Sequence, residues 1–218
     1  MATSLRGAAV ALALLATQAA DALTPAEVFE KVAPSVWRIR TYDHEGLPLA
    51  VGSAVVIGAE RLVTNCHVLR QAASFVVGRG AARHAGTLEL WDTARDLCRV
   101  KAAIGDVPAV GLADTSRLAV DDDVFALGSP PGRELTWSAG LFKGLRADTA
   151  DRLTIIQTSA AFWPGSSGGG LFDSQGRLIG VTTLLSTSTD AQRLNLAVPA
   201  EWVRELPQRH AALRQAFE

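Results

Sequence analysis

The chain has 218 residues, and its 21 Lys or Arg side chains nearly balance its 22 Asp or Glu side chains, for a formal net charge of -1. This length suits one medium or two small domains, and the balanced charge argues against a nucleic-acid partner. Charged residues at 20% and hydrophobic residues at 48% describe a globular protein rather than a disordered one, and two cysteines are too few for a disulfide-built scaffold.

The first 22 residues have the pattern of a signal peptide. Arg6 supplies positive charge, residues 7–16 form a short apolar run, and residues 20–22 read as a small-x-small cleavage site. The apolar run is short for a membrane span, although an uncleaved anchor is the alternative. Residues 1–22 are therefore predicted to direct export to the periplasm or the medium and to be removed. The mature chain would start at Leu23, with no further contact with a membrane.

Short strands dominate the rest of the chain. A first helix is predicted where Thr24 caps, Pro25 occupies the first helical position and Glu27 completes a capping box, with Pro34 ending it. Twelve strand candidates follow, separated by turn residues, and they predict a barrel or sandwich. They are residues 36–41, 50–57, 62–65, 74–77, 86–91, 97–104, 123–127, 135–145, 153–158, 169–172, 180–185 and 194–198.

A second helix is predicted from Pro199 to the C-terminus. Pro207 lies inside it and is expected to break or kink it, because proline lacks a backbone N–H. Residues 112–118 are the predicted seam between two halves of similar size.

A glycine-rich turn holds the first candidate for chemistry. Ser167 stands in the run Gly165-Ser166-Ser167-Gly168-Gly169. Glycines permit unusual backbone conformations, so such a turn can expose a serine and aim backbone N–H groups at one point. An ordinary Gly/Ser loop is the alternative for this motif alone.

A histidine and an aspartate complete a possible catalytic set. His67 follows a strand-like run and precedes a helical turn, and Asp96 stands at the entry of an apolar strand. A hydroxyl nucleophile needs a base, and the base needs a carboxylate that holds its tautomer. The chain order His67, Asp96, Ser167 is that of chymotrypsin, and it differs from the subtilisin and α/β-hydrolase orders.

Longer segments around these residues resemble the trypsin/chymotrypsin-fold serine proteases of the Deg/HtrA-like bacterial branch. The similarity extends over residues 35–205. It rests on residues 63–68, 96–101, 128–132, 138–141, 156–169, 178–182 and 195–199.

This resemblance implies an all-β fold of two six-stranded antiparallel barrels with a short N-terminal and a C-terminal helix. Residues 23–115 would form the first barrel, and residues 116–218 would form the second barrel and the C-terminal helix. The implied function is an exported serine endopeptidase that acts on polypeptides through His67, Asp96 and Ser167. The N–H groups of Gly165 and Ser167 would form the oxyanion hole, and no cofactor or metal is expected.

The sequence departs from the family in three places. Deg-type relatives usually carry a peptide-binding PDZ domain, whereas this chain ends soon after Pro199. Ser166 stands where digestive relatives have an aspartate that pairs with a freed N-terminus, so activation by that ion pair is not expected. Cys66 directly precedes His67, an unusual place for a cysteine in the family.

The resemblance also implies a specificity pocket. Ala161, six residues before the nucleophile, would line its base, and Asn195 would stand at its end. Thr183, Leu184 and Leu185 would form one wall. Because Ala161 is not acidic, small or medium apolar side chains are expected in place of Lys or Arg.

Two other functions remain open. Residues 165–169 also fit the G-x-S-x-G elbow of serine esterases, but that elbow needs a helix after the serine and a later histidine, and only His210 lies downstream. The other possibility is a protease fold that binds without turnover. Cys66 and His67 as metal ligands lack the usual ligand spacing.

A disulfide between Cys66 and Cys98 is expected. If His67 and Asp96 are hydrogen-bonded, their backbone segments run close together, and Cys98 lies two residues beyond Asp96 on what would be the same strand face. Export permits oxidation, although two buried free thiols are the alternative.

Overall fold

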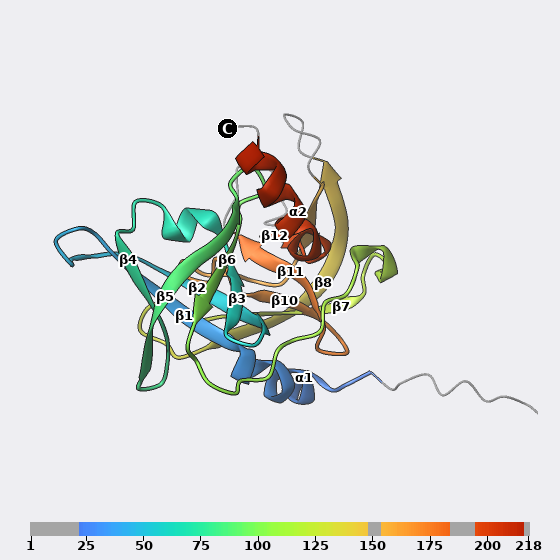
Figure 1. The fold of residues 1–218 in the computed structure, drawn as a ribbon. Helices are drawn as coiled ribbons and strands as arrows, with labels where there is room; N and C mark the ends of the chain where they lie inside the picture. The colour runs from blue at the N-terminus through green and yellow to red at the C-terminus, as the bar shows by residue number, and fades with distance from the viewer. Residues whose placement is uncertain (1–21, 148–153, 184–194, 216–218) are drawn as a thin grey trace, which may run out of the picture.

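The computed structural model describes residues 22–147, 154–183 and 195–215. Its strands form two closed six-stranded antiparallel barrels, side by side in Figure 1, which confirms the predicted fold. The predicted signal peptide falls almost wholly outside the described residues. Among the helices described, none is long and apolar enough to cross a membrane.

The first barrel closes in the order β1-β2-β3-β6-β5-β4 and the second in the order β10-β11-β12-β9-β8-β7. The first consists of β1 (Val36–Tyr42), β2 (Pro48–Gly58), β3 (Arg61–Thr64), β4 (Ser74–Arg79), β5 (Ala82–Asp92) and β6 (Leu97–Ala102). The second consists of β7 (Asp123–Gly128), β8 (Thr136–Ala147), β9 (Thr154–Thr158), β10 (Gly170–Asp173), β11 (Leu178–Thr183) and β12 (Asn195–Pro199). Each predicted strand is present with shifted ends.

Each barrel has its own core, and a third core joins them. Ile39, Leu62 and Val100 belong to the interior of the first barrel, and Ile156 and Leu171 to that of the second. The third cluster combines side chains of both barrels and both helices, for example Val32, Leu97, Phe172 and Leu206. Burial of this shared apolar surface holds the two barrels together.

The N-terminal helix α1 (Pro25–Val32) has the predicted capping box. The Thr24 hydroxyl and backbone N–H donate to the Glu27 carboxylate, which lowers the pKa of Glu27 below its ordinary value. Beyond this cap, Lys31 donates to the carbonyl of Gln175, in the hairpin between β10 and β11. The helix therefore fastens the N-terminal segment to the second barrel.

The C-terminal helix α2 (Glu201–Gln215) corrects two predictions. It begins at Glu201, because Pro199 still pairs with Gly180 in the sheet, and it continues through Pro207 without a break. Its face around Trp202 and Leu206 is buried, and this packing outweighs the hydrogen bond that the proline removes, a cost of about 3 kcal/mol. The helix packs against β5 and β6 of the first barrel and β12 of the second, and in Figure 1 it stands at the top of the molecule above β12.

Two strand glycines, Gly140 in the second barrel and Gly58 in the first, compare a tightly packed position with an open one. A Cβ at Gly140 would lie 2.2 Å from the backbone nitrogen of Ala160, whereas a Cβ at Gly58 would meet nothing within 4 Å. Gly140→Ala should therefore lower the free energy of unfolding by about 3 kcal/mol or more, and Gly58→Ala by about 0.5 kcal/mol at most. Urea unfolding of both variants measures this difference, and equal stability would contradict the described packing.

Candidate active site

His67 lies on a short 3₁₀ turn, η2 (Cys66–Leu69), that follows β3. Its ring nitrogen Nδ1 is 2.7 Å from Asp96 Oδ2, and its backbone N–H donates to Asp96 Oδ1 at 2.8 Å. Because the carboxylate accepts, Nδ1 carries the proton and Nε2 keeps a free lone pair. The histidine is thus held in the tautomer that a general base requires.

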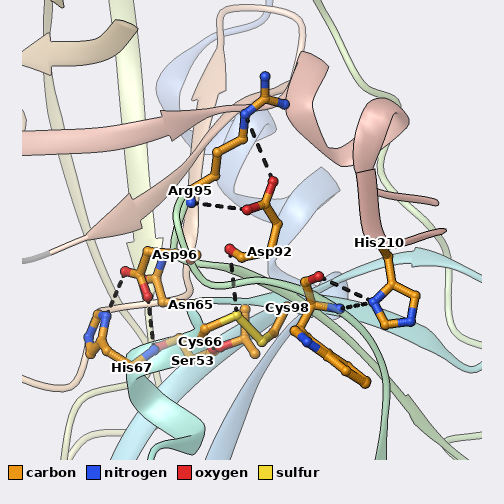
Figure 2. The surroundings of a disulfide bond; sticks show 11 residues. Ser53, Asn65, Cys66, His67, Asp92, Arg95, Asp96, Cys98 and His210 are labelled. Atoms are coloured by element: carbon orange, nitrogen blue, oxygen red, sulfur yellow. Dashed lines mark hydrogen bonds and ion pairs between the residues drawn. A yellow bond between two sulfur atoms is a disulfide. The ribbon is translucent and has the colours of Figure 1, made fainter. Parts of the chain in front are cut away.

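Hydrogen bonds also hold the main chain of Asp96 in place (Figure 2). Its carbonyl accepts from the amide Nδ2 of Asn65 at 3.1 Å and from the backbone N–H of Cys66 at 3.3 Å. Thr183 adds a third donor to the carboxylate, with its hydroxyl 3.3 Å from Oδ2. Charge-assisted bonds of this kind hold a carboxylate in one orientation. For Thr183, the structure therefore shows a contact with Asp96 that the sequence prediction missed.

The disulfide Cys66–Cys98 is present, with Cα atoms 5.0 Å apart. The strand argument that led to it is wrong in one respect, because Asp96 lies in the turn before β6, with φ at 51°. Asp tolerates this left-handed conformation better than most residues. The two cysteines meet because β3 and β6 are neighbours, with Thr64 paired to Cys98.

Helix α2 supports the Asp96 turn through ion pairs with two residues that precede Asp96. Asp92, with a side chain only 1% exposed, binds Arg209 of this helix at 2.5 Å. Arg95 reaches Glu205 at 2.5 Å and lies 4.4 Å from the ring centroid of Trp202. Figure 2 shows Asp92 and Arg95 beside the disulfide. The C-terminal helix thus braces the loop that carries the carboxylate.

His210, on the same helix, is buried against the first barrel. Its ring meets the Trp91 ring edge-on, with centroids 4.2 Å apart, and its Nδ1 is 3.3 Å from the Trp91 carbonyl. Nothing in the sequence predicts this contact. The His210 ring packs on β5 near the disulfide. Its contact with Trp91 helps to hold the loop that follows β5.

Ser167 is 5% exposed. Ser53 of the first barrel holds the loop that carries Ser167. The Ser53 N–H donates to the Ser167 carbonyl at 2.7 Å, and its hydroxyl donates to the Gly165 carbonyl at 2.9 Å. That same hydroxyl accepts from the N–H of Ser129 at 2.8 Å. Sequence reasoning missed Ser53; its only signal is a polar residue inside an apolar strand.

Gly168 allows this close contact between the barrels. Its φ is +86°, and an added Cβ would lie 2.1 Å from the Ser53 carbonyl oxygen. Both observations exclude a side chain here. The glycine predicted to serve the nucleophile turn therefore also lets the two barrels approach at Ser53.

A tight turn over Trp163–Ser166 precedes the nucleophile. The N–H of Ser166 donates to the Trp163 carbonyl at 2.8 Å, with Pro164 at the second position and Gly165, at φ +89°, at the third. Proline followed by a residue of positive φ defines a type II turn, whose central peptide is rotated by about 180° relative to type I. The orientation of the Gly165 N–H is thereby set.

The nucleophile and base segments lie next to each other, although no hydrogen bond joins these two described side chains, Ser167 and His67. A Cβ added at Gly52 would lie 2.5 Å from the side chain of Val68 and 3.2 Å from the Ser167 carbonyl. Gly52 of β2 thus lies between the two segments and is close to both. Catalytic hydrogen bonds are often long without substrate and tighten when it binds.

Ser166 occupies a closed, neutral environment. It is 4% exposed, and its Oγ accepts from the Trp163 N–H at 3.4 Å. A Cβ at Gly128 would lie 2.9 Å from the Ser166 Cβ. The backbone N–H of Leu23 instead donates to the Ser174 carbonyl, on the β10–β11 hairpin. That no activating ion pair with the N-terminus forms at Ser166 stays a prediction.

The predicted pocket residues are only partly described. Ala161, which is exposed, lines a small hollow that also includes Phe162 and Ser166. Asn195 turns its amide to the Ala160 carbonyl at 2.9 Å, so it shapes the backbone before Ala161. Leu184 and Leu185 lie outside the described residues.

Removal of the disulfide should destabilise the fold measurably. The bridge spans 32 residues, for which the chain-entropy estimate is about 3–4 kcal/mol. The double variant Cys66→Ala/Cys98→Ala should lose about that much in urea unfolding. The reduced wild-type protein is the control. Unchanged stability in both would contradict the role assigned to the bridge.

Comparison with known proteins places the chain among peptidases. The family described as trypsin-like peptidase domain matches residues 52–181, more than half of the chain. Protease Do-like 1, chloroplastic, of Arabidopsis thaliana is 30% identical over 84% of this chain and 46% of its own length. A probable periplasmic serine endoprotease DegP-like of Hahella chejuensis is 32% identical over 70% of this chain and 34% of its own length. The chain thus spans less than half of these relatives.

Solved structures agree with the sequence comparison. The HtrA-type protease AlgW with tripeptide superposes with a TM-score of 0.75 at 31% identity, covering 84% of this chain and 62% of that one. The two barrels, the clustered His67 and Asp96 and the peptidase-domain match support the same conclusion. This chain belongs to the trypsin-like peptidase family and has HtrA/Deg-type proteases among its relatives.

Proposed function

We propose that this protein is an exported serine endopeptidase that cleaves peptide bonds through Ser167, His67 and Asp96. The observation that carries the proposal is the double contact of His67 with Asp96, through ring and backbone, at 2.7 and 2.8 Å. A merely structural histidine has no need for a carboxylate that binds its ring and its own N–H together.

In the first step, the Ser167 hydroxyl attacks the peptide carbonyl carbon while Nε2 of His67 takes the hydroxyl proton. The imidazolium that forms is stabilised by the Asp96 carboxylate, which remains ionised. The Thr183 hydroxyl and the backbone N–H of His67 keep this carboxylate in place.

The carbonyl oxygen becomes an oxyanion in this step. The N–H groups of Gly165 and Ser167 stabilise it, and removal of one such donor typically costs about 2.7–4 kcal/mol in the transition state. The type II turn at Trp163–Ser166 supports this assignment, because it holds the peptide before Gly165 in one orientation.

Collapse of the intermediate breaks the peptide bond. The leaving amine takes the proton from His67 Nε2, and the acyl group stays on the Ser167 oxygen as an ester. A water molecule then gives its proton to His67 and attacks this ester, which releases the new carboxyl end and returns the proton to Ser167.

The esterase alternative conflicts with the local fold. A nucleophile elbow passes from strand to serine to helix, whereas Ser167 is followed by strand β10 and the partner histidine precedes it in the chain. The second alternative, a protease fold that binds without turnover, has the same contacts and differs only in reactivity.

Export and a polypeptide substrate belong to the same proposal. The signal-like residues 1–22, the Cys66–Cys98 disulfide and a relative named as periplasmic support an oxidising location. The similar protease AlgW is described with a bound tripeptide. Small or medium apolar side chains are the proposed preference, because Ala161 brings no charge to the pocket base.

Substitution of the proposed triad tests the function. Ser167→Ala should lower kcat by about 10⁶-fold, and Asp96→Asn by about 10⁴-fold through the wrong imidazole tautomer. Ser116→Ala, at an exposed serine of the 3₁₀ turn η3 (Thr115–Arg117), is the matched control. Hydrolysis of a quenched peptide by the mature protein gives the rates, and near-full activity of Ser167→Ala would refute the proposal.

A peptide library tests the proposed specificity. Cleavage should follow small or medium apolar residues, with Ser167→Ala as the blank. Ala161→Asp should shift the preference towards Lys and Arg, because a carboxylate at the pocket base attracts a cation. Cleavage after Lys or Arg by the unchanged protein would contradict the assignment of Ala161.

A further inference from the structure

A cavity of about 390 Å³ lies on the side of the first barrel where it meets the loop between β7 and β8. Its volume is within the range of small-molecule sites. Five arginines and a single carboxylate, that of Glu134, contribute to its lining. The arginines are Arg38, Arg40, Arg79, Arg83 and Arg133.

The strand register explains how the arginines gather around a hollow. Arg38 of β1 pairs with Gly78 of β4, and Gly78 pairs with Arg83 of β5, so the three form one row on the same face. Because Gly78 has no side chain, space is left between the guanidinium groups of Arg38 and Arg83. A Cβ at Gly78 would lie 2.9 Å from Cδ of Arg83. Arg40 extends the face two residues along β1.

These positive charges lack balancing carboxylates. In the described part of the chain, none of the five arginines forms an ion pair, although eight other Lys or Arg side chains and one histidine do. Arg38, Arg79 and Arg83 spend some donors on backbone carbonyls, such as those of Ser129 and Gly80. A guanidinium has five N–H donors, so each keeps others free.

The electrostatic strain is visible at Arg38. Burial lowers its pKa, and the neighbouring charges of Arg40 and Arg83 lower it further, while Glu134 acts in the opposite direction. Arginine nevertheless stays protonated in proteins. Because the whole chain has a net charge of -1, the excess of positive charge is local to the cavity.

One wall of the cavity is the segment that packs on the nucleophile turn. Arg38 donates to the carbonyls of Ser129 and Pro130, at 3.3 and 3.1 Å, and also to that of Arg133. A Cβ at Gly165 would lie 2.5 Å from Cδ of Pro131. The loop from Ser129 to Glu134 therefore touches the arginines on one side and the Trp163–Ser166 turn on the other.

We propose that this cavity binds a compact multivalent oxyanion of the phosphate type and that the bound anion orders the loop Ser129–Glu134. Guanidinium groups match phosphate oxygens in bidentate geometry, and their donors converge here from the strands β1, β4 and β5 and from the loop between β7 and β8. The anion neutralises the repulsion among the arginines and bridges Arg133 of the loop to Arg40 of β1.

Calorimetric titration with inorganic pyrophosphate at low ionic strength tests the site. The Ser167→Ala protein is used, so the outcome does not depend on peptidase activity. Arg40→Gln/Arg133→Gln should raise the Kd by about tenfold or more. These two arginines are chosen because neither makes a side-chain hydrogen bond within the described residues, so their replacement spares the fold. Arg117→Gln, at an exposed arginine of the 3₁₀ turn η3 (Thr115–Arg117), is the control and should leave the Kd unchanged.

Two further measurements complete the test. Amide hydrogen exchange in residues 129–134 should slow with pyrophosphate in the parent protein and stay constant in the double variant. Flotation with phosphatidylcholine vesicles that contain phosphatidic acid separates a lipid phosphate from a free one. Binding in either arm that the double variant loses supports the proposal. Absence of saturable binding in both arms, or equal binding by the double variant, overturns it.

Discussion

The contact between the His67 segment and the Asp96 turn is the constraint on which the rest of the site depends. Consecutive residues Asn65, Cys66 and His67 all donate to Asp96, two to its carbonyl and one to its carboxylate, and the His67 ring adds a fourth bond. The Cys66–Cys98 disulfide then links the His67 segment covalently to the strand that follows the Asp96 turn. Base and carboxylate are therefore oriented within one barrel, before the second barrel contributes.

The nucleophile comes from the other barrel, so its position relative to His67 depends on the interface. Ser53 ties both Gly165 and Ser167 to the first barrel. The terminal helices reinforce this arrangement, since α1 reaches the β10–β11 hairpin through Lys31 and α2 reaches the Asp92 turn through Arg209. The N-terminal helix is thus attached to the second barrel, and the C-terminal helix is attached to the first barrel.

Much of this could be predicted from local patterns. The strands followed from alternating residues and turn chemistry, and the α1 cap from Thr24 and Glu27. The order of His67, Asp96 and Ser167 pointed to one protease architecture. What sequence could not supply were contacts across long separations, such as Ser53 on Ser167 or Thr183 on Asp96. The helix is not broken at Pro207, because the local rule for proline ignores the packing of α2 on the barrels.

The most direct test of the central claim is labelling of the mature protein with a fluorophosphonate, followed by peptide mass spectrometry. Such a reagent needs an activated serine hydroxyl, so it reports the reactivity that separates an enzyme from a silent binding protein. The account predicts a single modification, on Ser167, because His67 Nε2 is free to take its proton. An unlabelled protein, or a label on another serine, would contradict it.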